Sequence, residues 1–362
     1  MEFAPSPNGF IVDTDLNFPS DDAQALILLL MCAGSRVRGI SACAGNTFAE
    51  EALVNVAALC GLLQRWDVPL AAGAHHSRFS TRRDVALKDA AQGRLPFVGS
   101  HAKNVGPRFG PQAKRADDLC KKFHVYDSLS ALLDRQPDPV DIICLGPLTN
   151  LSDTLAGASQ LREKISSVWS MSGCLANSVE KPRFEFNVWY DPLSAAAVYR
   201  SGLPILLFSY DLTRRTRCSA ALIEALTAKP SDGAGHLWCT DFLNLAVQHG
   251  PTMPLCDQLV AAAYLDPDIV LRRRPGSLLI ECEDGDLLGF CREVPSSPFG
   301  LEIVTEVDTA RLTDFFTSFL RLTGSHPRMG AVSQFLQGWL YSIDGGHHAL
   351  DGDIVDLSGS MI

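Results

Sequence analysis

The stretch DTDLNFPSDD, residues 13–22, places four carboxylates between an apolar run and the first turn of an apolar helix. The run Gly9–Asp15 predicts a short buried strand. The segment Asp21–Ala33 predicts a helix, with Ser20 as the N-cap residue. This stretch is therefore the first strand-helix unit of the chain, and the remaining sequence repeats the same order.

Strand and helix patterns continue to alternate after this unit. Predicted strands cover Val37–Gly45, Val68–Ala74, Val140–Pro147, Ser167–Gly173 and Ile205–Tyr210, and predicted helices cover Thr47–Gln64, Ala116–Leu133, Leu148–Ala156, Pro192–Ser201, His236–Gln248, Gln258–Leu265 and Thr309–Leu322. Residues 75–115 form a long irregular excursion, and residues 269–306 alternate as strands with a turn at residues 283–285. The order predicts an α/β fold in which helices flank a mainly parallel central sheet. Ligands of such sheets bind beyond the carboxyl ends of the strands.

Length and composition limit the domain organisation and the class of function. The 362 residues, 46% of them hydrophobic, can bury a large core. We assign residues 1–323 to one α/β domain and residues 324–362 to a C-terminal helix and tail packed on it. The formal charge of −10 argues against a general nucleic-acid binder. We therefore expect a small-molecule substrate.

Cysteine usage and hydropathy predict the compartment. The eleven cysteines are an odd number, and they lack CxxC and zinc-finger spacing. Buried, reduced thiols are the natural interpretation, and they favour a reducing compartment. The apolar run Leu26–Met31 is too short to span a bilayer, and the N-terminus does not resemble a signal peptide. We predict a cytoplasmic protein without membrane contact.

The four carboxylates of residues 13–22 would repel one another strongly unless a cation lies between them. Oxygen-only ligands favour Ca²⁺ or Mg²⁺, and Ca²⁺ is preferred where sugar hydroxyls must also bind. A structural alternative is that Asp21 and Asp22 stabilise the helix through its dipole, with no metal present. That alternative does not explain Asp13 and Asp15, which interrupt an apolar strand and would be costly to bury unpaired.

Residues 13–26 resemble the DxDxGxDDxxAL motif of the inosine-uridine type nucleoside hydrolases, although two extra residues intervene and Asn17 replaces a glycine. Further family motifs follow in the same order: Gly45-Asn46-Thr47, the LGPLTN run at residues 145–150, the strand end at Met171–Cys174, the EFN run at 185–187 with Asp191-Pro192, and Cys256-Asp257 with Asp266-Pro267. An ordered series is more specific than any single motif. The chain thus resembles a divergent member of this family, which implies a Rossmann-like nucleoside hydrolase fold.

The resemblance also implies a reaction and a set of site residues. Asp15, Asp22, Asp257 and the backbone carbonyl of Leu145 would hold Ca²⁺, and Asp15 would be the general base for the metal-bound water. The substrate-binding residues would be Asp21, Asn46, Met171, Asn177, Glu185 and Asn187. The implied activity is hydrolysis of the N-glycosidic bond of a ribonucleoside or a related N-riboside, by a homodimer or homotetramer.

The acid that protonates the leaving base is where the sequence departs most from the family. Cys256 stands where many members have a histidine, and a thiol is a poor proton donor. His101, in the long excursion, resembles a family loop histidine and is our second catalytic candidate, although a surface role is commoner. Glu185 and Asn187 alternate around Phe186, which places both polar groups on one side of a strand. For Asp191, before a proline, we favour an N-cap role.

Two other functions fit parts of the same sequence. A catalytically weakened protein of the same fold, which binds a nucleoside or ribose, is consistent with Asn17 and Cys256. A phosphohydrolase could use the DTD triplet as nucleophile and acid. Haloacid-dehalogenase-like enzymes, which use such a triplet, usually follow the second aspartate with Gly-Thr or a similar pair, and Leu16-Asn17 does not fit that pattern.

Overall fold

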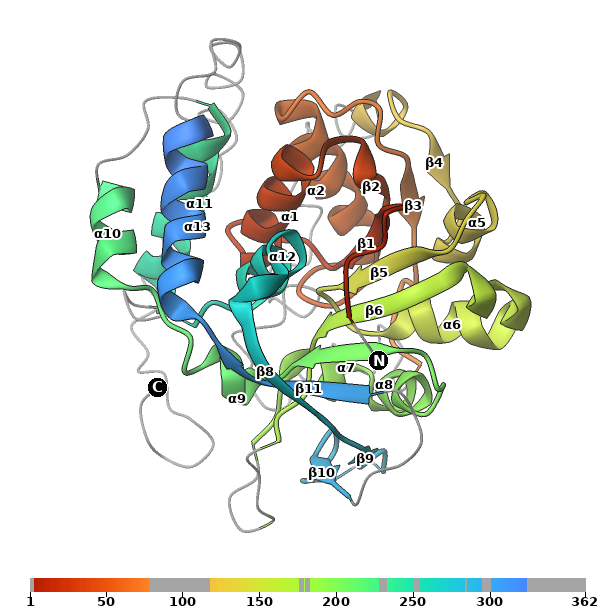
Figure 1. Ribbon diagram of the computed structural model, residues 1–362. Coiled ribbons are helices and arrows are strands. Elements are labelled where there is room, and N and C mark those ends of the chain that lie inside the picture. The colour runs from red at the N-terminus through yellow and green to blue at the C-terminus, as the bar shows by residue number, and fades with distance from the viewer. Residues whose placement is uncertain are drawn as a thin grey trace.

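The computed structural model describes residues 3–78, 118–175, 179, 183–227, 233–249, 254–283, 285–294 and 301–323. These residues form a nine-stranded sheet with the order β4-β3-β2-β1-β5-β6-β7-β11-β8 (Figure 1). Neighbouring strands are parallel except for β8, which runs antiparallel to β11 at one edge. The predicted α/β class with a mainly parallel sheet is therefore confirmed.

The strands of the large sheet are β1 (Phe10–Thr14), β2 (Val37–Ala42), β3 (Leu70–Ala72), β4 (Val125–Tyr126), β5 (Val140–Cys144), β6 (Ile165–Met171), β7 (Ile205–Phe208), β8 (Val270–Pro275) and β11 (Leu301–Val307); β9 (Leu278–Ile280) and β10 (Cys291–Glu293) form a separate antiparallel pair. The α-helices are α1 (Asp21–Cys32), α2 (Ala49–Leu62), α5 (Leu129–Asp134), α6 (Thr149–Gly157), α7 (Phe186–Tyr190), α8 (Pro192–Tyr199), α9 (Tyr210–Thr213), α10 (Ala220–Thr227), α11 (Gly233–His249), α12 (Asp257–Leu265) and α13 (Thr309–Thr323). Short 3₁₀ turns cover Gly34–Arg36, Ser159–Lys164 and Pro267–Ile269.

Helices cover both faces of the sheet and bury a separate core on each. Phe10, Val12 and Ile143 belong to the core beneath α1, α2, α11, α12 and α13. Ile11 and Ile142, which alternate with them along the same strands, belong to the core beneath α5, α6 and α8. Both faces of the central strands are therefore buried, which explains their nearly continuous apolar sequences.

The order in which successive strands are added to the sheet reverses between β1 and β5. β2 and β3 continue from one side of β1, whereas β5 pairs with its other side. This is a topological switch point, where open α/β sheets bind ligands at the carboxyl ends of the strands. Asp15 follows β1 and Leu145 follows β5, so the predicted site residues lie at this point.

Two predicted capping roles are confirmed. The Ser20 hydroxyl accepts a hydrogen bond from the backbone N–H of Ala23 at 3.1 Å, and it caps α1. The Asp191 carboxylate caps α8 by accepting from the N–H of Ser194 at 3.0 Å, with Pro192 in the first turn. Both residues satisfy donors that helix N-termini leave without an intrahelical partner.

Several predicted boundaries were wrong for local reasons. The helix predicted over Ala116–Leu133 is broken, because β4 pairs with β3 and only α5 follows, capped by Ser128. Thr47 does not open α2, because its hydroxyl donates to Glu51 and the helix begins at Ala49. The short helices α7 and α10 were not predicted.

The eleven cysteines are free, and seven of them are buried, in agreement with the predicted reduced thiols. Within the described ranges, no helix is both long and apolar enough to cross a membrane. Residues 324–362, which we assigned to a C-terminal helix and tail, lie outside the described residues, so that prediction stays untested.

Replacing Ser20 with alanine should lower the free energy of unfolding by about 1 kcal/mol, because the first turn of α1 loses its side-chain acceptor. Urea unfolding of the variant measures the change. Ser20→Thr keeps a hydroxyl cap and serves as the control. Equal stability of Ser20→Ala and the wild-type protein would contradict the capping role.

Candidate metal and active site

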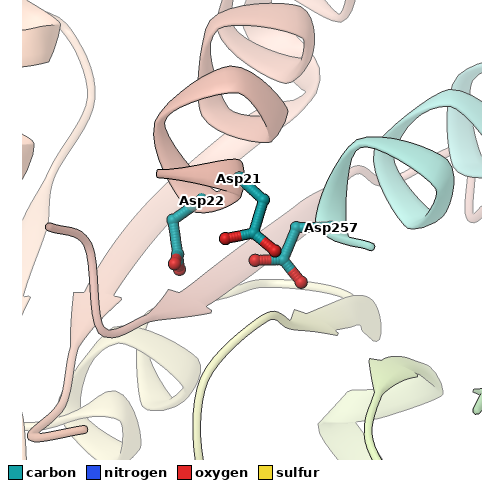
Figure 2. Close-up of side chains that lie close together, drawn as sticks. All are labelled: Asp21, Asp22 and Asp257. Atoms are coloured by element: carbon teal, nitrogen blue, oxygen red, sulfur yellow. The ribbon is translucent and has the colours of Figure 1, made fainter. Parts of the chain in front are cut away.

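Three carboxylates meet where the N-terminal ends of α1 and α12 converge. Asp21 and Asp22 open α1, and Asp257 opens α12 (Figure 2). One carboxylate oxygen from each lies within 4.8 Å of the others. Residues more than 230 positions apart therefore converge, as the predicted metal site requires for Asp22 and Asp257. The family resemblance assigned Asp21 to the sugar, and the structure places it inside this carboxylate cluster.

Asp15 is held beside the cluster by a closely fitted backbone. It is fully buried, and its Oδ2 accepts a hydrogen bond from the N–H of Asn46 at 2.6 Å. A Cβ atom at Gly45 would lie 2.0 Å from Asp15 Oδ2, and one at Gly146 would lie 2.9 Å from Oδ1. The glycines of two predicted motifs are thus needed so that the strand ends can approach this carboxylate.

Whether a cation fits this region depends on the hydrogen bonding of its buried carboxylate oxygens. Asp13 Oδ2, Asp15 Oδ1 and Asp22 Oδ2 are buried and have no hydrogen-bond partner among the described residues. Buried carboxylate oxygens are costly unless they are paired or bind a metal. An oxygen-only set of several carboxylates suits a hard divalent cation such as Ca²⁺. The residues present therefore fit the ion that the sequence predicted.

Burial raises the pKa of four aspartates in this region, and neighbouring carboxylates raise it further for three of them. Burial raises the pKa of Asp13 from its ordinary value to about 7. Burial and then the charge of Asp21 raise the pKa of Asp22 to about 7. For Asp15 and Asp257, burial and then neighbouring aspartates raise the pKa well above its usual range. Without a cation, the folded state therefore favours protonated carboxyl groups.

Metal-free protein should become less stable as the pH rises from about 4 to about 7. In this window folded Asp13 and Asp22 keep protons that the unfolded chain has released, so stability falls with pH, by on the order of 1 kcal/mol or more per group. Urea unfolding in chelator at pH 5 and pH 7.5 measures this. Added calcium should remove the trend, because a cation favours ionised carboxylates. A metal-free protein that gains stability between these pH values would contradict the expectation.

Two supporting side chains were missed by the sequence reasoning. The hydroxyl of Thr14, which lies between Asp13 and Asp15 in the sequence, donates to Asp22 Oδ1. Asn150 Nδ2 donates to Asp13 Oδ1 at 2.7 Å, and Asn150 Oδ1 accepts from the N–H of Ala74 at 2.7 Å. Asn150 belongs to the LGPLTN run at residues 145–150, so the signal was present, but its partner could not be read from the sequence.

The predicted sugar-binding residues of β6 and α7 form one hydrogen-bonded group beside Leu145. Asn187 Nδ2 donates to the carbonyl of Leu145 at 2.7 Å and to the carbonyl of Met171 at 3.0 Å. The carboxylate of Glu185 accepts from the N–H groups of Gly173, Asn187 and Val188 at 2.7–3.1 Å. Asn187 thus lies against the carbonyl that was predicted to bind calcium.

The expected alternation of Glu185 and Asn187 along a strand was wrong. Glu185 is the N-cap residue of α7, and Asn187 lies in the first turn of that helix. Helix formation is explained by the Glu185 carboxylate, which accepts two of the N–H groups that the first turn leaves without partners. The two side chains are still brought together, but by a helix start rather than by a pleat. Their role in sugar binding stays a prediction.

The structure describes only some of the remaining residues that the sequence analysis singled out. Asn46 is half-buried, and its backbone N–H contacts Asp15. His101 and Asn177 lie outside the described residues. Cys256 is buried directly before Asp257, and its Sγ donates to Thr213 Oγ1 at 3.4 Å. Burial and then the charge of Asp21 raise the pKa of Cys256 well above its usual range, so the thiol stays protonated and is a poor acid.

Curated relatives share about a third of their aligned residues with this chain. The pyrimidine-specific ribonucleoside hydrolase RihA of Salmonella typhimurium is 33% identical over 218 residues, which is 60% of this chain and 65% of the relative. The RihA of Enterobacter sp. is 32% identical over 208 residues, or 58% of this chain and 62% of the relative. The matched part of the chain thus spans less than two thirds of the length of these relatives.

Solved structures with the same fold match this chain over nearly their whole length. A plant nucleoside hydrolase, PpNRh1, superposes with a TM-score of 0.65 at 21% identity. The match covers 87% of this chain and 99% of the PpNRh1 chain. An inosine-guanosine nucleoside hydrolase superposes with a TM-score of 0.68 at 17% identity, over 86% and 98% of the two chains. The model of the inosine-uridine preferring nucleoside hydrolase family matches residues 10–314. Because this match covers most of the chain, the chain belongs to the inosine-uridine preferring nucleoside hydrolase family.

Proposed function

We propose that this protein hydrolyses the N-glycosidic bond of a ribonucleoside or a related N-riboside, with calcium as its metal. The observation that carries the proposal is the convergence of Asp21, Asp22 and Asp257 beside the buried Asp15, whose Oδ1 has no partner among the described residues. The metal is inferred from this oxygen-only arrangement, and the reaction from membership of the family.

Calcium would be held by Asp15, Asp22, Asp257 and the backbone carbonyl of Leu145. When bound, it would polarise the attacking water and take up hydroxyl groups of the ribose. The Leu145 carbonyl already accepts from Asn187 Nδ2, and a carbonyl oxygen has a second lone pair. Asn187 would therefore hold this carbonyl in place at the carboxyl end of β5.

Asp15 would accept the proton of the attacking water. Its Oδ2 is fixed by the Asn46 N–H, which leaves Oδ1 as the oxygen that can take the proton. Cleavage of an N-ribosyl bond passes through an oxocarbenium-like state, so the sugar must be oriented without crowding its anomeric carbon. Asp21, Asn46, Glu185 and Asn187 would hold the ribose hydroxyls.

The leaving base needs a proton donor other than Cys256. The Cys256 thiol already donates to Thr213, and its raised pKa makes it a weak acid. We therefore assign Cys256 to the wall of the pocket. His101 is the residue we propose for the proton transfer, on its resemblance to a family loop histidine.

A nucleoside panel tests the reaction directly. Purine and pyrimidine ribonucleosides are incubated with the protein and calcium, and free base and reducing sugar are measured. Because the RihA relatives are pyrimidine-specific, uridine and cytidine are the first substrates to try. Release of both products in equal amounts supports the proposal. Bound calcium without release of base from any member of the panel would overturn it.

A ribose- or nucleoside-binding protein without turnover is the second candidate. The weak acid at Cys256 favours it, because leaving-group activation is the step the described residues supply least well. Calorimetry distinguishes the two functions. Ribose or nucleoside affinity together with undetectable hydrolysis would establish the binding protein, and calcium-dependent turnover would exclude it.

We also propose a cytoplasmic homodimer or homotetramer, as the family resemblance implies. The free thiols support a reducing compartment. Light scattering coupled to size exclusion would measure the oligomeric state, and a monomer at micromolar concentration would contradict the proposal.

A further inference from the structure

Three buried polar side chains join the helices behind the carboxylate cluster. Gln24 on α1 donates from Nε2 to Asp241 Oδ2 on α11 at 2.9 Å. Gln258 on α12 donates from Nε2 to Gln24 Oε1 at 2.6 Å. Gln24 and Gln258 are fully buried, and Asp241 is 5% exposed. These residues, which we call the Gln24–Asp241–Gln258 network, connect α1 with α11 and α12, which lie more than 200 positions later in the sequence.

The network is attached to both sides of the carboxylate cluster. Gln24 is two residues beyond Asp22 in the first turns of α1, and Gln258 directly follows Asp257 in the first turn of α12. Asp241 Oδ2 also accepts from the backbone N–H of Ser20, which precedes Asp21. A shift of α1 relative to α12 would therefore have to break one of these hydrogen bonds.

The hydrogen bonds also fix the orientation of the central amide. Asp241 Oδ2 also accepts from the N–H of Ser20 and is therefore an acceptor, which requires the NH₂ group of Gln24 on that side, so the Gln24 oxygen faces Gln258. The Trp238 indole N–H donates to the backbone carbonyl of Gln24 at 3.1 Å and holds the same turn from α11. Each member thus has one favoured arrangement.

Stability alone does not explain polar residues at these positions. The surrounding core is apolar, and polar groups that are buried there cost free energy unless they are fully bonded. Gln258 Oε1 is buried and has no partner among the described residues, so the network is not fully satisfied. Apolar residues of similar size would pack here at lower cost, which points to a role in geometry.

We propose that Gln24, Asp241 and Gln258 are positioning residues that set the spacing between Asp22 and Asp257, and with it the affinity of the site for calcium. The inference rests on the proposed function, because it takes these carboxylates as calcium ligands. Residues behind a metal site orient the ligands, and their loss lowers metal affinity roughly 10- to 100-fold.

The test replaces each amide with a side chain of similar length that cannot form the hydrogen bond. Gln24→Met and Gln258→Met remove the contact while preserving volume, and Asp241→Asn replaces the carboxyl group with an amide of the same size. Calcium dissociation constants are measured by titration calorimetry on the full chain, far below the unfolding temperature. We expect each Met variant to bind calcium about 10-fold or more weakly. The calcium affinity of the double variant should fall by no more than the product of the two single fold-changes. A fall smaller than this product would show that the two residues act together.

Tyr264→Phe is the matched control. Tyr264 lies on the same helix as Gln258, is fully buried, and loses one hydrogen bond to Asp141 Oδ2, but it lies at the opposite end of α12. Calcium affinity of this variant should match that of the wild-type protein. If Asp241→Asn fails to fold, the two Met variants carry the test.

The outcomes separate this inference from the proposed function. Folded Met variants that bind calcium within twofold of wild type, in a protein that binds calcium and hydrolyses nucleosides, would overturn the positioning role alone. An equal loss of affinity in Tyr264→Phe would also overturn it, because any weakening of α12 would then suffice. A wild-type protein that binds no calcium would overturn the proposed function, and this inference with it.

Discussion

Asp15→Asn should lower kcat for nucleoside hydrolysis by a factor of about 10³ while the fold is retained. The amide has the size of the carboxylate, so it fits between Gly45 and Gly146. Its one oxygen can still accept from the N–H of Asn46, so the NH₂ group takes the place of Oδ1 and cannot accept a proton from water. Asp15 would serve both as base and as metal ligand, so the loss combines two effects. Steady-state kinetics at saturating calcium measure it.

The matched control for this substitution is Asp141→Asn. Asp141 is also a buried aspartate in the central sheet, and its carboxylate accepts from Ser6, Ser167 and Tyr264. It is the second residue of β5, whereas Asp15 follows the opposite end of the neighbouring strand. Asp141→Asn should therefore affect stability and leave kcat within a few-fold of wild type. An Asp15→Asn enzyme with more than a tenth of wild-type kcat would remove Asp15 from the catalytic role.

The fold was largely predictable because each strand-helix unit carries its own local signal. The apolar run before Asp15, the Ser20 cap and the apolar helix that follows are all contiguous in the sequence. The errors occur where a tertiary contact or a local cap decides the conformation. β4 has two residues and exists because it pairs with β3, and α7 begins where the Glu185 carboxylate accepts from N–H groups of the first turn.

The candidate site was predictable only in part, for the same physical reason. The carboxylates of residues 13–22 stand together in the chain, and the family resemblance added Asp257. The side chains that hold this site through hydrogen bonds are far apart in the sequence. The contact of Asn150 with Asp13 and that of Gln258 with Gln24 each join residues more than 100 positions apart. A single sequence contains no direct record of such pairs.

Removal of calcium should abolish hydrolysis, and added calcium should restore it. The carboxylates of Asp15, Asp22 and Asp257 would then repel one another or take up protons, and neither state can orient ribose or polarise water. Dialysis against a chelator, followed by assays with and without added calcium, measures the loss. Magnesium should restore less activity, because it requires a strict octahedral shell and releases water reluctantly.

Thermal unfolding gives a second measurement of the same ion that does not depend on turnover. A ligand that binds only the folded state at 100 times its dissociation constant adds about 2.7 kcal/mol of stability. Calcium should therefore raise the unfolding temperature of the wild-type protein by several degrees. Asp257→Asn should lose most of this increase, because it removes one of the charges that meet at the start of α12. Full activity after chelation, together with an unfolding temperature that calcium does not change, would show that these carboxylates meet for a reason other than binding this ion.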